Sequence, residues 1–275
     1  MSIWHPFLFY INNRDKLTGV FMVDIKICVP YYNVIEEETQ QGIYDLLDSD
    51  INCALLTVQG TNIANARNKL VNEDKSDLMI QKLDDGFTHY LFIDADVVVT
   101  PKAIKRLLDL DLDVVSAVYK SREQSDTFTA GIFAKNENGE FIDALKFKSD
   151  STGLMEADWV GGGCLLVKKE VLENTPYPWF HYPVKEITKN GNIHRKLIFE
   201  DIGFCMNVKD AGYRIYVDGD TEVKHLARNY NSPIVNDYEL VFKNINDDMN
   251  KMFQIVRGLS YELDRVYKES NKEGK

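Results

Sequence analysis

The sequence predicts an α/β fold with a mostly parallel, Rossmann-like central sheet and helices on both of its faces. Short apolar segments of strand length alternate with longer segments of helical spacing between residues 25 and 119. One apolar run, 90–93, ends abruptly in the carboxylates Asp94 and Asp96. The chain has 275 residues, 44% of them hydrophobic. This length and composition predict one sizeable domain with appendages.

Each element of the alternating part is defined by its residue pattern. Four apolar strands are expected, at 25–29, 55–58, 90–93 and 114–119. Three helices are expected between them, at 36–47, 65–83 and 101–110. The last helix has the clearest start, because Thr100 can cap it and Pro101 occupies its first position.

Beyond residue 119 the alternation gives way to an antiparallel ribbon. The ribbon is expected over 128–147, with a turn at 136–139. A strand at 159–160 then runs into three successive glycines, and 164–167 continues it. Glycine lets the backbone approach a ligand closely and adopt positive φ, so the triplet indicates either a ligand site or a plain bulge.

The remaining elements complete the domain. A loop with three prolines at 176–183 carries aromatic side chains that either stack on a ligand or cover the core. A helix over 200–211, closed by Gly212 at the C′ position, and a strand at 214–217 follow.

The domain is expected to span 24–230, between an N-terminal extension, 1–23, and a C-terminal helical tail, 231–275. The net charge of −11 and the pI near 5.0 argue against nucleic acid as the main partner, because phosphate backbones are bound by clustered Lys and Arg. The four cysteines have no CxxC spacing, which predicts free thiols without disulfides or a zinc site. No segment has the composition of a signal peptide or a membrane span, so a cytoplasmic protein is expected.

Asp94 and Asp96 form the most informative pair. Side chains at positions i and i+2 share one face of a strand, so the two carboxylates can converge on one point. Mg²⁺ and Mn²⁺ prefer oxygen ligands, and Mg²⁺ sites combine carboxylates with substrate phosphates. The pair therefore predicts a metal-phosphate site at the carboxyl end of a strand. The alternative is that the two Asp residues merely close the strand and start a turn.

Several short motifs occur in a fixed order along the chain. They are Pro30-Tyr31-Tyr32-Asn33, Ala66-Arg67-Asn68, Phe92-Ile93-Asp94-Ala95-Asp96, Trp159-Val160-Gly161-Gly162-Gly163, Glu200-Asp201, Ala211-Gly212-Tyr213-Arg214-Ile215 and His225. In this order they resemble glycosyltransferases of the GT-A fold, close to the inverting enzymes with bacterial, phage and large-virus members. The resemblance covers roughly residues 24 to 230. It implies transfer of a hexose or deoxyhexose from a UDP- or GDP-sugar to a hydroxyl of a glycan, lipid-linked or protein acceptor.

The resemblance also implies a divalent cation, Mn²⁺ or Mg²⁺. Asp96 and His225 would hold it, and Asp94 would lie closer to the ribose or contact the metal through water. The cation would neutralise the charge that builds on the departing nucleoside diphosphate. His225 could instead be a surface imidazole or a satisfied core imidazole.

The donor site is implied in the N-terminal half. Pro30, Tyr31 and Asn33 fall where the family cradles the base and ribose, and Arg67 falls where a cation reaches the nucleotide. Tyr31 could instead be a packing residue, and Arg67 a charge on a helix surface. A second basic pair, Lys120 and Arg122, follows the fourth strand and could bind phosphate or sugar, or simply be solvated.

The acceptor side is implied in the C-terminal half. Gly162 and Gly163 fall beneath the donor sugar and beside the acceptor. Asp201 would be the base that takes the proton from the attacking hydroxyl, and Glu200 would order the acceptor or the loop. Both carboxylates also suit the positive end of a helix dipole, so a capping role is the alternative.

Two other functions fit parts of the pattern. Asp94 and Asp96 match the hhhDxDx[TV] motif of haloacid-dehalogenase-type phosphatases, in which the first Asp is the nucleophile. That family places the motif on the first strand of its core, whereas two strands precede it here. A non-catalytic nucleotide-sugar-binding protein is the third possibility.

Overall fold

The computed structural model describes residues 10–11, 25–60, 62–73, 81–83, 86–120, 126–135, 137, 141–189 and 192–226. The chain divides into two compact units, Met1–Leu226 and Ala227–Lys275. The second unit lies outside the described residues, and so does the helical tail that the sequence predicts.

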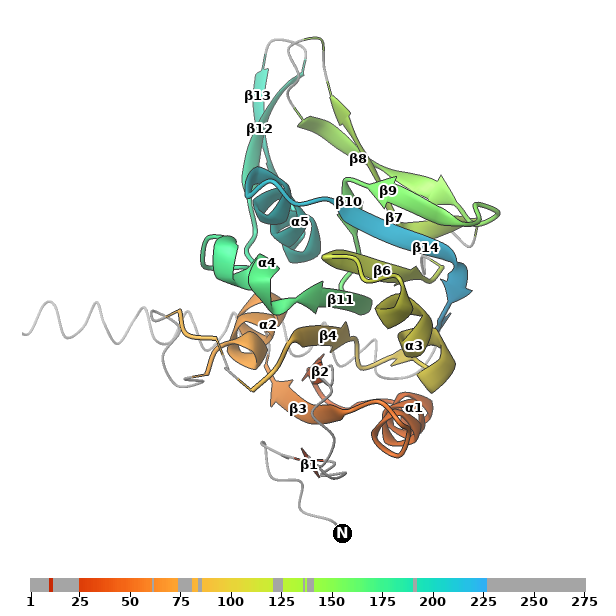
Figure 1. Ribbon diagram of the computed structural model, residues 1–275. Coiled ribbons are helices and arrows are strands. Elements are labelled where there is room, and N and C mark those ends of the chain that lie inside the picture. Colours follow the sequence, from red (N-terminus) through yellow and green to blue (C-terminus); the bar gives the residue numbers. More distant parts are fainter. Residues whose placement is uncertain are drawn as a thin grey trace, which may run out of the picture. The chain divides into compact units, whose positions relative to one another are not determined.

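The first unit is built on an eight-stranded sheet with the order β1-β3-β2-β4-β11-β6-β14-β9 (Figure 1). Its strands are β1 (Tyr10–Ile11), β2 (Ile25–Tyr31), β3 (Cys53–Gln59), β4 (His89–Ile93), β6 (Val114–Val118), β9 (Leu154–Ala157), β11 (Cys164–Lys168) and β14 (Ile215–Glu222). Strands β3, β2 and β4 are mutually parallel, and β14 is parallel to β6. Strand β11 runs antiparallel between β4 and β6. The predicted α/β class is confirmed, with a reversed strand in the middle of the sheet.

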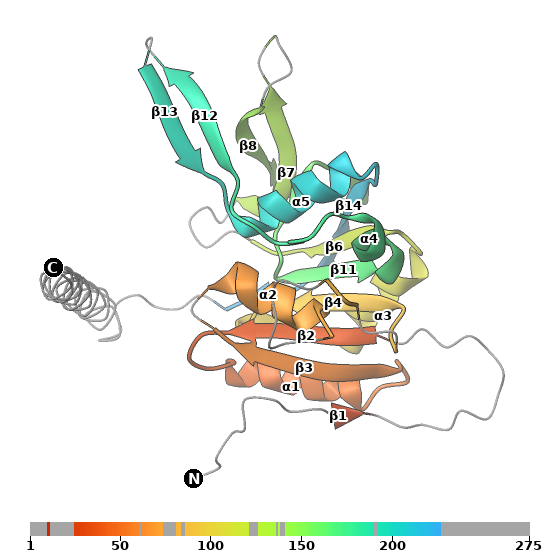
Figure 2. The ribbon, with the colours of Figure 1, turned by 90° about the vertical axis from the view of Figure 1, so that its left-hand side faces the viewer.

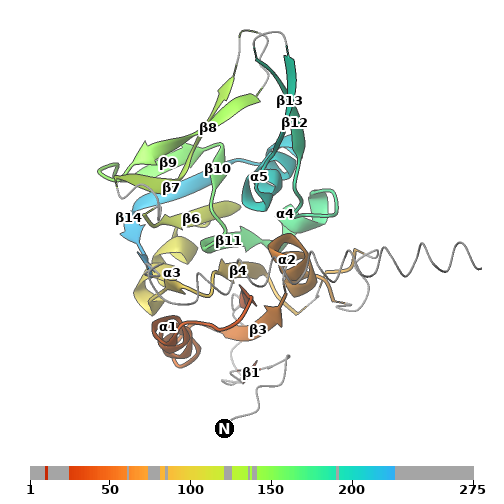
Figure 3. The same cartoon turned by 180° about the vertical axis from the view of Figure 1, so that it is seen from behind.

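Five helices lie in the described part of the chain: α1 (Glu37–Leu47), α2 (Ile63–Val71), α3 (Pro101–Asp109), α4 (Lys169–Asn174) and α5 (Glu200–Asp210). Helices α1 and α3 lie on one face of the sheet, and α2, α4 and α5 lie on the other (Figures 2 and 3). The buried side chains of the two groups of helices belong to two separate hydrophobic clusters. The predicted layers of helix, sheet and helix are therefore present, an arrangement consistent with a GT-A-like fold. No helix among these residues combines the length and apolar character that crossing a membrane requires.

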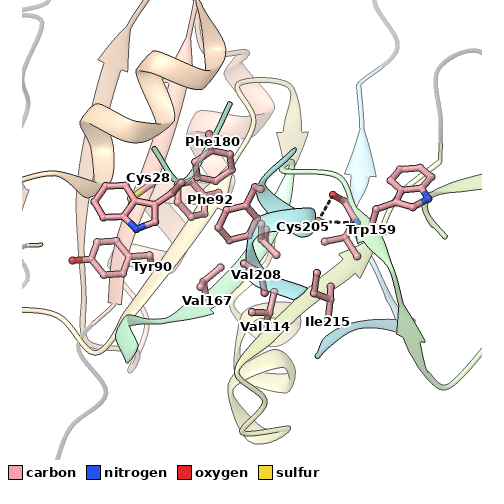
Figure 4. Packing of buried hydrophobic residues seen from close by; sticks show 14 of the residues in the cluster. Cys28, Tyr90, Phe92, Val114, Trp159, Val167, Phe180, Cys205, Val208 and Ile215 are labelled. Carbon is pink, nitrogen blue, oxygen red and sulfur yellow. Dashed lines mark hydrogen bonds between the residues drawn. The ribbon is translucent and has the colours of Figure 1, made fainter. Parts of the chain in front are cut away.

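The face under α2, α4 and α5 has an aromatic core (Figure 4). The ring of Phe180 stacks on that of Phe204 at 4.5 Å and meets that of Phe92 edge-on at 5.0 Å. The side-chain amide of Asn68 exchanges two hydrogen bonds with the backbone of Phe180. Because Trp179 and Phe180 are almost fully buried, these two members of the aromatic loop cover the core and are not a platform for a ligand.

Three smaller sheets surround the central one. Strands β7 (Thr127–Lys135) and β8 (Phe141–Lys148) form the predicted antiparallel ribbon, to which β10 (Trp159–Val160) adds a third strand. Strands β10 and β11 thus belong to different sheets, so the prediction that 164–167 continues the strand 159–160 is wrong. The hairpin of β12 (Val184–Lys189) and β13 (Asn192–Leu197), which the sequence analysis missed, projects toward the same end as the ribbon (Figures 1 and 2). Strands β5 (Val97–Val98) and β15 (Lys224–His225) form a two-residue pairing.

Local hydrogen bonds and backbone conformation explain where α3 begins and where α5 and α2 end. Helix α3 begins as predicted, since Thr100 Oγ1 accepts the N–H of Ala103 at 3.2 Å. Helix α5 ends at the predicted place, and Gly212 has the positive φ of a C′ residue. The helix predicted over 65–83 is shorter, because Asn72 is extended and its side chain accepts the N–H of Lys82 at 2.8 Å.

Candidate functional site

The predicted site residues gather at one edge of the central sheet. Strands β2, β3, β4 and β6 end there, and the antiparallel β11 begins there. The N–H of Asp94, directly after β4, donates to the carbonyl of Gly163, directly before β11, at 3.1 Å. In an open α/β sheet the carboxyl ends of the strands are where ligands bind, so this edge is the candidate site.

Arg67 of α2 lies at the centre of the site and is only 2% exposed. Its Nη2 is 2.6 Å from Asp94 Oδ1, and its Nη1 is 2.5 Å from Glu200 Oε1. Burial disfavours the charged guanidinium, but these carboxylates outweigh that penalty and raise the pKa of Arg67 above its ordinary value. The interpretation of Arg67 as a helix-surface charge is therefore wrong. Its contact with a nucleotide stays a prediction.

The glycine triplet makes room for side chains of the protein itself, among them those of Arg67 and Tyr119. A Cβ at Gly162 would lie 2.4 Å from Arg67 Nη2, and a Cβ at Gly163 would lie 2.8 Å from the ring of Tyr119. A Cβ at Gly161 would meet the hydroxyl of Tyr119 at 2.2 Å. None of the three glycines has positive φ, so the expectation that the triplet serves to adopt positive φ is wrong. Close packing explains the triplet instead, and the donor contacts of Gly162 and Gly163 stay predictions.

Tyr119 is a site residue that the sequence analysis missed. Its hydroxyl accepts the N–H of Gly163 at 2.9 Å, and its ring meets that of His225 edge-on at 5.4 Å. Burial raises the pKa of Tyr119 well above its ordinary value, so the phenol is neutral. In the sequence, Tyr119 is only a tyrosine at the end of a predicted strand. A tyrosine that packs in the core looks the same, so nothing in the sequence distinguishes it as a site residue.

Asp96 and His225 are brought together by the pairing of β5 with β15, in which His225 lies opposite Val97. His225 Nε2 is 3.6 Å from Asp96 Oδ1. His225 Nδ1 lies 3.1 Å from the carbonyl oxygen of Lys120, which favours a tautomer with the proton on Nδ1. This second contact fixes the ring with Nε2 toward the carboxylate, as in the orientation of metal-binding histidines.

These two side chains fit the divalent cation that the resemblance implies, as part of its ligand set. Within the described part of the chain, no group of three or more His, Cys, Asp or Glu side chains is placed to hold a metal ion. A two-residue site suits Mg²⁺ and similar hard cations, which keep water and substrate phosphates as their other ligands.

Glu200 and Asp201 occupy the first turn of α5. Asp201 Oδ1 accepts the N–H of Ile202 at 2.8 Å, so the carboxylate does bind a backbone donor at the helix start. Burial and the neighbouring Glu200 carboxylate raise the pKa of Asp201 to about 7, although Arg67 and the Ile202 N–H oppose the change. An aspartate with this pKa can gain or lose a proton near neutral pH.

Three hollows adjoin these groups. One of about 250 Å³ is lined by Tyr31, Asn33 and Gln59 at the ends of β2 and β3. Pro30, in contrast, is buried within β2. A second hollow, of about 400 Å³, is bordered by Lys120 and His225; Arg122 lies outside the described residues. The third, of about 310 Å³, contains Asp201 together with side chains of β8, β10 and β13.

No protein-family model and no curated protein matches the chain. Among solved structures, A197 from STIV has 16% identity and a TM-score of 0.44, over 76% of this chain and 95% of that one. GalNAc-T7 with UDP, GalNAc and Mn²⁺ has 10% identity and a TM-score of 0.43, over 77% and 45%. The 4-diphosphocytidyl-2C-methyl-D-erythritol synthase from Anaerococcus prevotii has 10% identity and a TM-score of 0.38, over 80% and 96%. Likenesses of this size do not bear on function.

Proposed function

We propose that this protein is a metal-dependent glycosyltransferase that moves a hexose or deoxyhexose from a nucleotide-sugar donor to a hydroxyl acceptor, with inversion. The observation that carries the proposal is the arrangement around Arg67. The guanidinium binds Asp94, two residues from Asp96, on one side and Glu200, next to Asp201, on the other. Carboxylates suited to metal binding and a carboxylate suited to proton transfer therefore lie around one charged centre.

The donor occupies the edge formed by β2, β3 and β4 in this proposal. The hollow at Tyr31 and Asn33 would take the base and ribose, and Asp94 would serve the ribose or the metal. Asp96 and His225 would hold Mn²⁺ or Mg²⁺. When bound, the cation neutralises charge on the leaving nucleoside diphosphate.

Asp201 is the general base in this proposal. Its carboxylate takes the proton from the acceptor hydroxyl while the hydroxyl oxygen forms a bond to the anomeric carbon. The bond from that carbon to the diphosphate oxygen breaks on the opposite face, so the configuration inverts. The pKa of Asp201, about 7, lies near the operating pH, which favours efficient proton transfer. Glu200, fixed by Arg67, orients the turn that carries the base.

The phosphatase alternative is less well supported. Its nucleophile would be Asp94, whose Oδ1 is engaged by Arg67, and β4 follows β2 and β3 in the same sheet instead of opening it.

The test is a panel of UDP- and GDP-sugars incubated with the protein, with and without Mn²⁺. The proposal predicts cation-dependent release of UDP or GDP. Release of inorganic phosphate from a phosphomonoester such as p-nitrophenyl phosphate would support the phosphatase instead. Tight donor binding without turnover would indicate a binding protein.

A further inference from the structure

Three strongly exposed apolar side chains lie on the β12–β13 hairpin and on the short segment that joins it to Glu200 and Asp201. Val184, Leu197 and Phe199 are 58%, 63% and 71% exposed, the highest values among the large apolar side chains of the described residues. We call these three residues the apolar strip.

The three side chains share one surface. Val184 and Leu197 are direct cross-strand partners in the β12–β13 hairpin, so they lie on the same face of it. Leu197 and Phe199 flank Ile198, which is 3% exposed. Successive side chains of an extended segment alternate in direction, so Leu197 and Phe199 point away from the buried Ile198 together.

The strip continues into the cavity that contains the proposed base. Leu197 and Phe199 line the same hollow of about 310 Å³ as Asp201, with Trp159 and Ile202 among its other apolar walls. A ligand that reaches Asp201 from this side therefore passes over the strip.

Two ion pairs lie beside the strip. Arg195 Nη2 is 3.0 Å from Glu186 Oε1 on the hairpin, and Lys196 Nζ is 2.9 Å from Asp143 Oδ1 of β8. Internal pairing of this kind favours an uncharged apolar occupant over a strongly charged one.

A two-stranded hairpin has marginal stability in water unless something covers a face, and contiguous exposed apolar side chains mark interaction sites. We infer that the acceptor is an amphiphile, with a hydroxylated head that reaches Asp201 and an aliphatic chain that covers the apolar strip. This inference rests on the proposed function, because it takes Asp201 as the acceptor-side base.

The test is calorimetric binding of n-alkyl glucosides, from methyl to octyl, each below its critical micelle concentration. Each methylene that is buried on the strip should tighten binding by about two- to fourfold. Leu197→Ser and Phe199→Ser should make the affinity nearly independent of chain length. The matched control is Tyr44→Ser on α1, which removes a side chain that is 44% exposed on another element and should keep the full dependence.

Equal affinity for methyl and octyl glucoside would overturn the inference, and so would an unchanged chain-length dependence in both strip variants. Sedimentation velocity provides a further check. If the wild type is a dimer that Leu197→Ser dissociates, a second copy covers the strip and the inference fails.

Donor hydrolysis by the wild-type protein, measured without acceptor, separates this inference from the proposed function. Donor turnover without chain-length dependence refutes the amphiphilic acceptor alone. Chain-length dependence without turnover of any donor refutes the glycosyltransferase, and the strip is then not an acceptor site.

Discussion

Arg67 and Glu200 are 133 residues apart in the sequence, and their side chains meet at 2.5 Å between Nη1 and Oε1. Through this contact α2, beside the proposed donor edge, is tied to α5, which carries the proposed base. The second guanidinium nitrogen, Nη2, binds Asp94 at 2.6 Å. One buried cation therefore holds carboxylates from both halves of the site.

Removal of this cation should destabilise the fold. Arg67→Ala leaves Asp94 and Glu200 without their buried partner, and a broken buried ion pair costs about 3–5 kcal/mol. Urea denaturation measures this loss in the free energy of unfolding. Lys105→Ala breaks the exposed pair of Lys105 with Asp50 and should leave the free energy of unfolding almost unchanged.

Two measurements test whether the ion pairs of Arg67 stabilise the fold. Arg67→Lys should remain well below wild type in stability, because an ammonium cannot reproduce the two-nitrogen contact. A loss of under 1 kcal/mol for Arg67→Ala would show that the network contributes little.

Gly162→Ala should disturb the ion pairs that Arg67 makes with Asp94 and Glu200. The new Cβ would lie 2.4 Å from Arg67 Nη2, and the guanidinium is held by two carboxylates, so it cannot move away freely. We expect a loss of roughly 1–3 kcal/mol in stability, as for other overpacked sites. Gly60→Ala is the control, because its Cβ would meet the nearest atom at an ordinary 3.5 Å. Equal stabilities of the two variants would contradict the packing explanation of the triplet.

Periodicity predicted the elements well where the signal was local. The strands before Asp94 and the capped start of α3 at Thr100 depend on neighbouring residues, and both were correct. The reversed direction of β11 depends on which strands it joins, and no local pattern encodes that choice.

The geometry of the candidate site could be predicted only in part. The pairing of His225 with Asp96 followed from the resemblance, and the structure places these side chains 3.6 Å apart. The burial of Arg67 could not be predicted, because a charged residue in a helix is usually exposed unless it is paired. Its partner Glu200 is 133 residues away, so nothing near Arg67 in the sequence marks the contact.

Protonation of Asp201 should make stability depend on pH. Its folded-state pKa of about 7 lies above the ordinary value of 3.8, so the folded protein binds the extra proton between these two pH values. The free energy of unfolding therefore falls as pH rises through this window. Asp201→Asn removes the dependence and should be the more stable protein at pH 8, by roughly 1–3 kcal/mol. Urea denaturation at pH 5 and pH 8 checks this, and a variant less stable than wild type at pH 8 would contradict it.

Metal binding should depend on Asp96 and His225. Electron paramagnetic resonance of Mn²⁺ in the presence of UDP measures the affinity directly. Asp96→Ala should abolish saturable binding. His225→Ala should weaken it by at least about tenfold, because loss of a residue that only orients a metal-ligating side chain already lowers metal affinity by about that factor. Asp50→Ala, on the surface, is the control and should bind as wild type does. Full activity in EDTA, or unchanged Mn²⁺ affinity in Asp96→Ala, would rule out the proposed metal site.

The most direct test of the account is the rate at which Asp201→Asn turns over the donor that the nucleotide-sugar panel identifies. The substitution keeps the shape of the side chain and removes its basicity. The account predicts a loss of roughly 10²–10⁴ in rate, the usual contribution of a positioned base, with donor affinity almost unchanged because the lost interaction belongs to the transition state. Turnover by Asp201→Asn close to the wild-type rate would contradict the assignment of the base, and a product with retained anomeric configuration by NMR would contradict inversion.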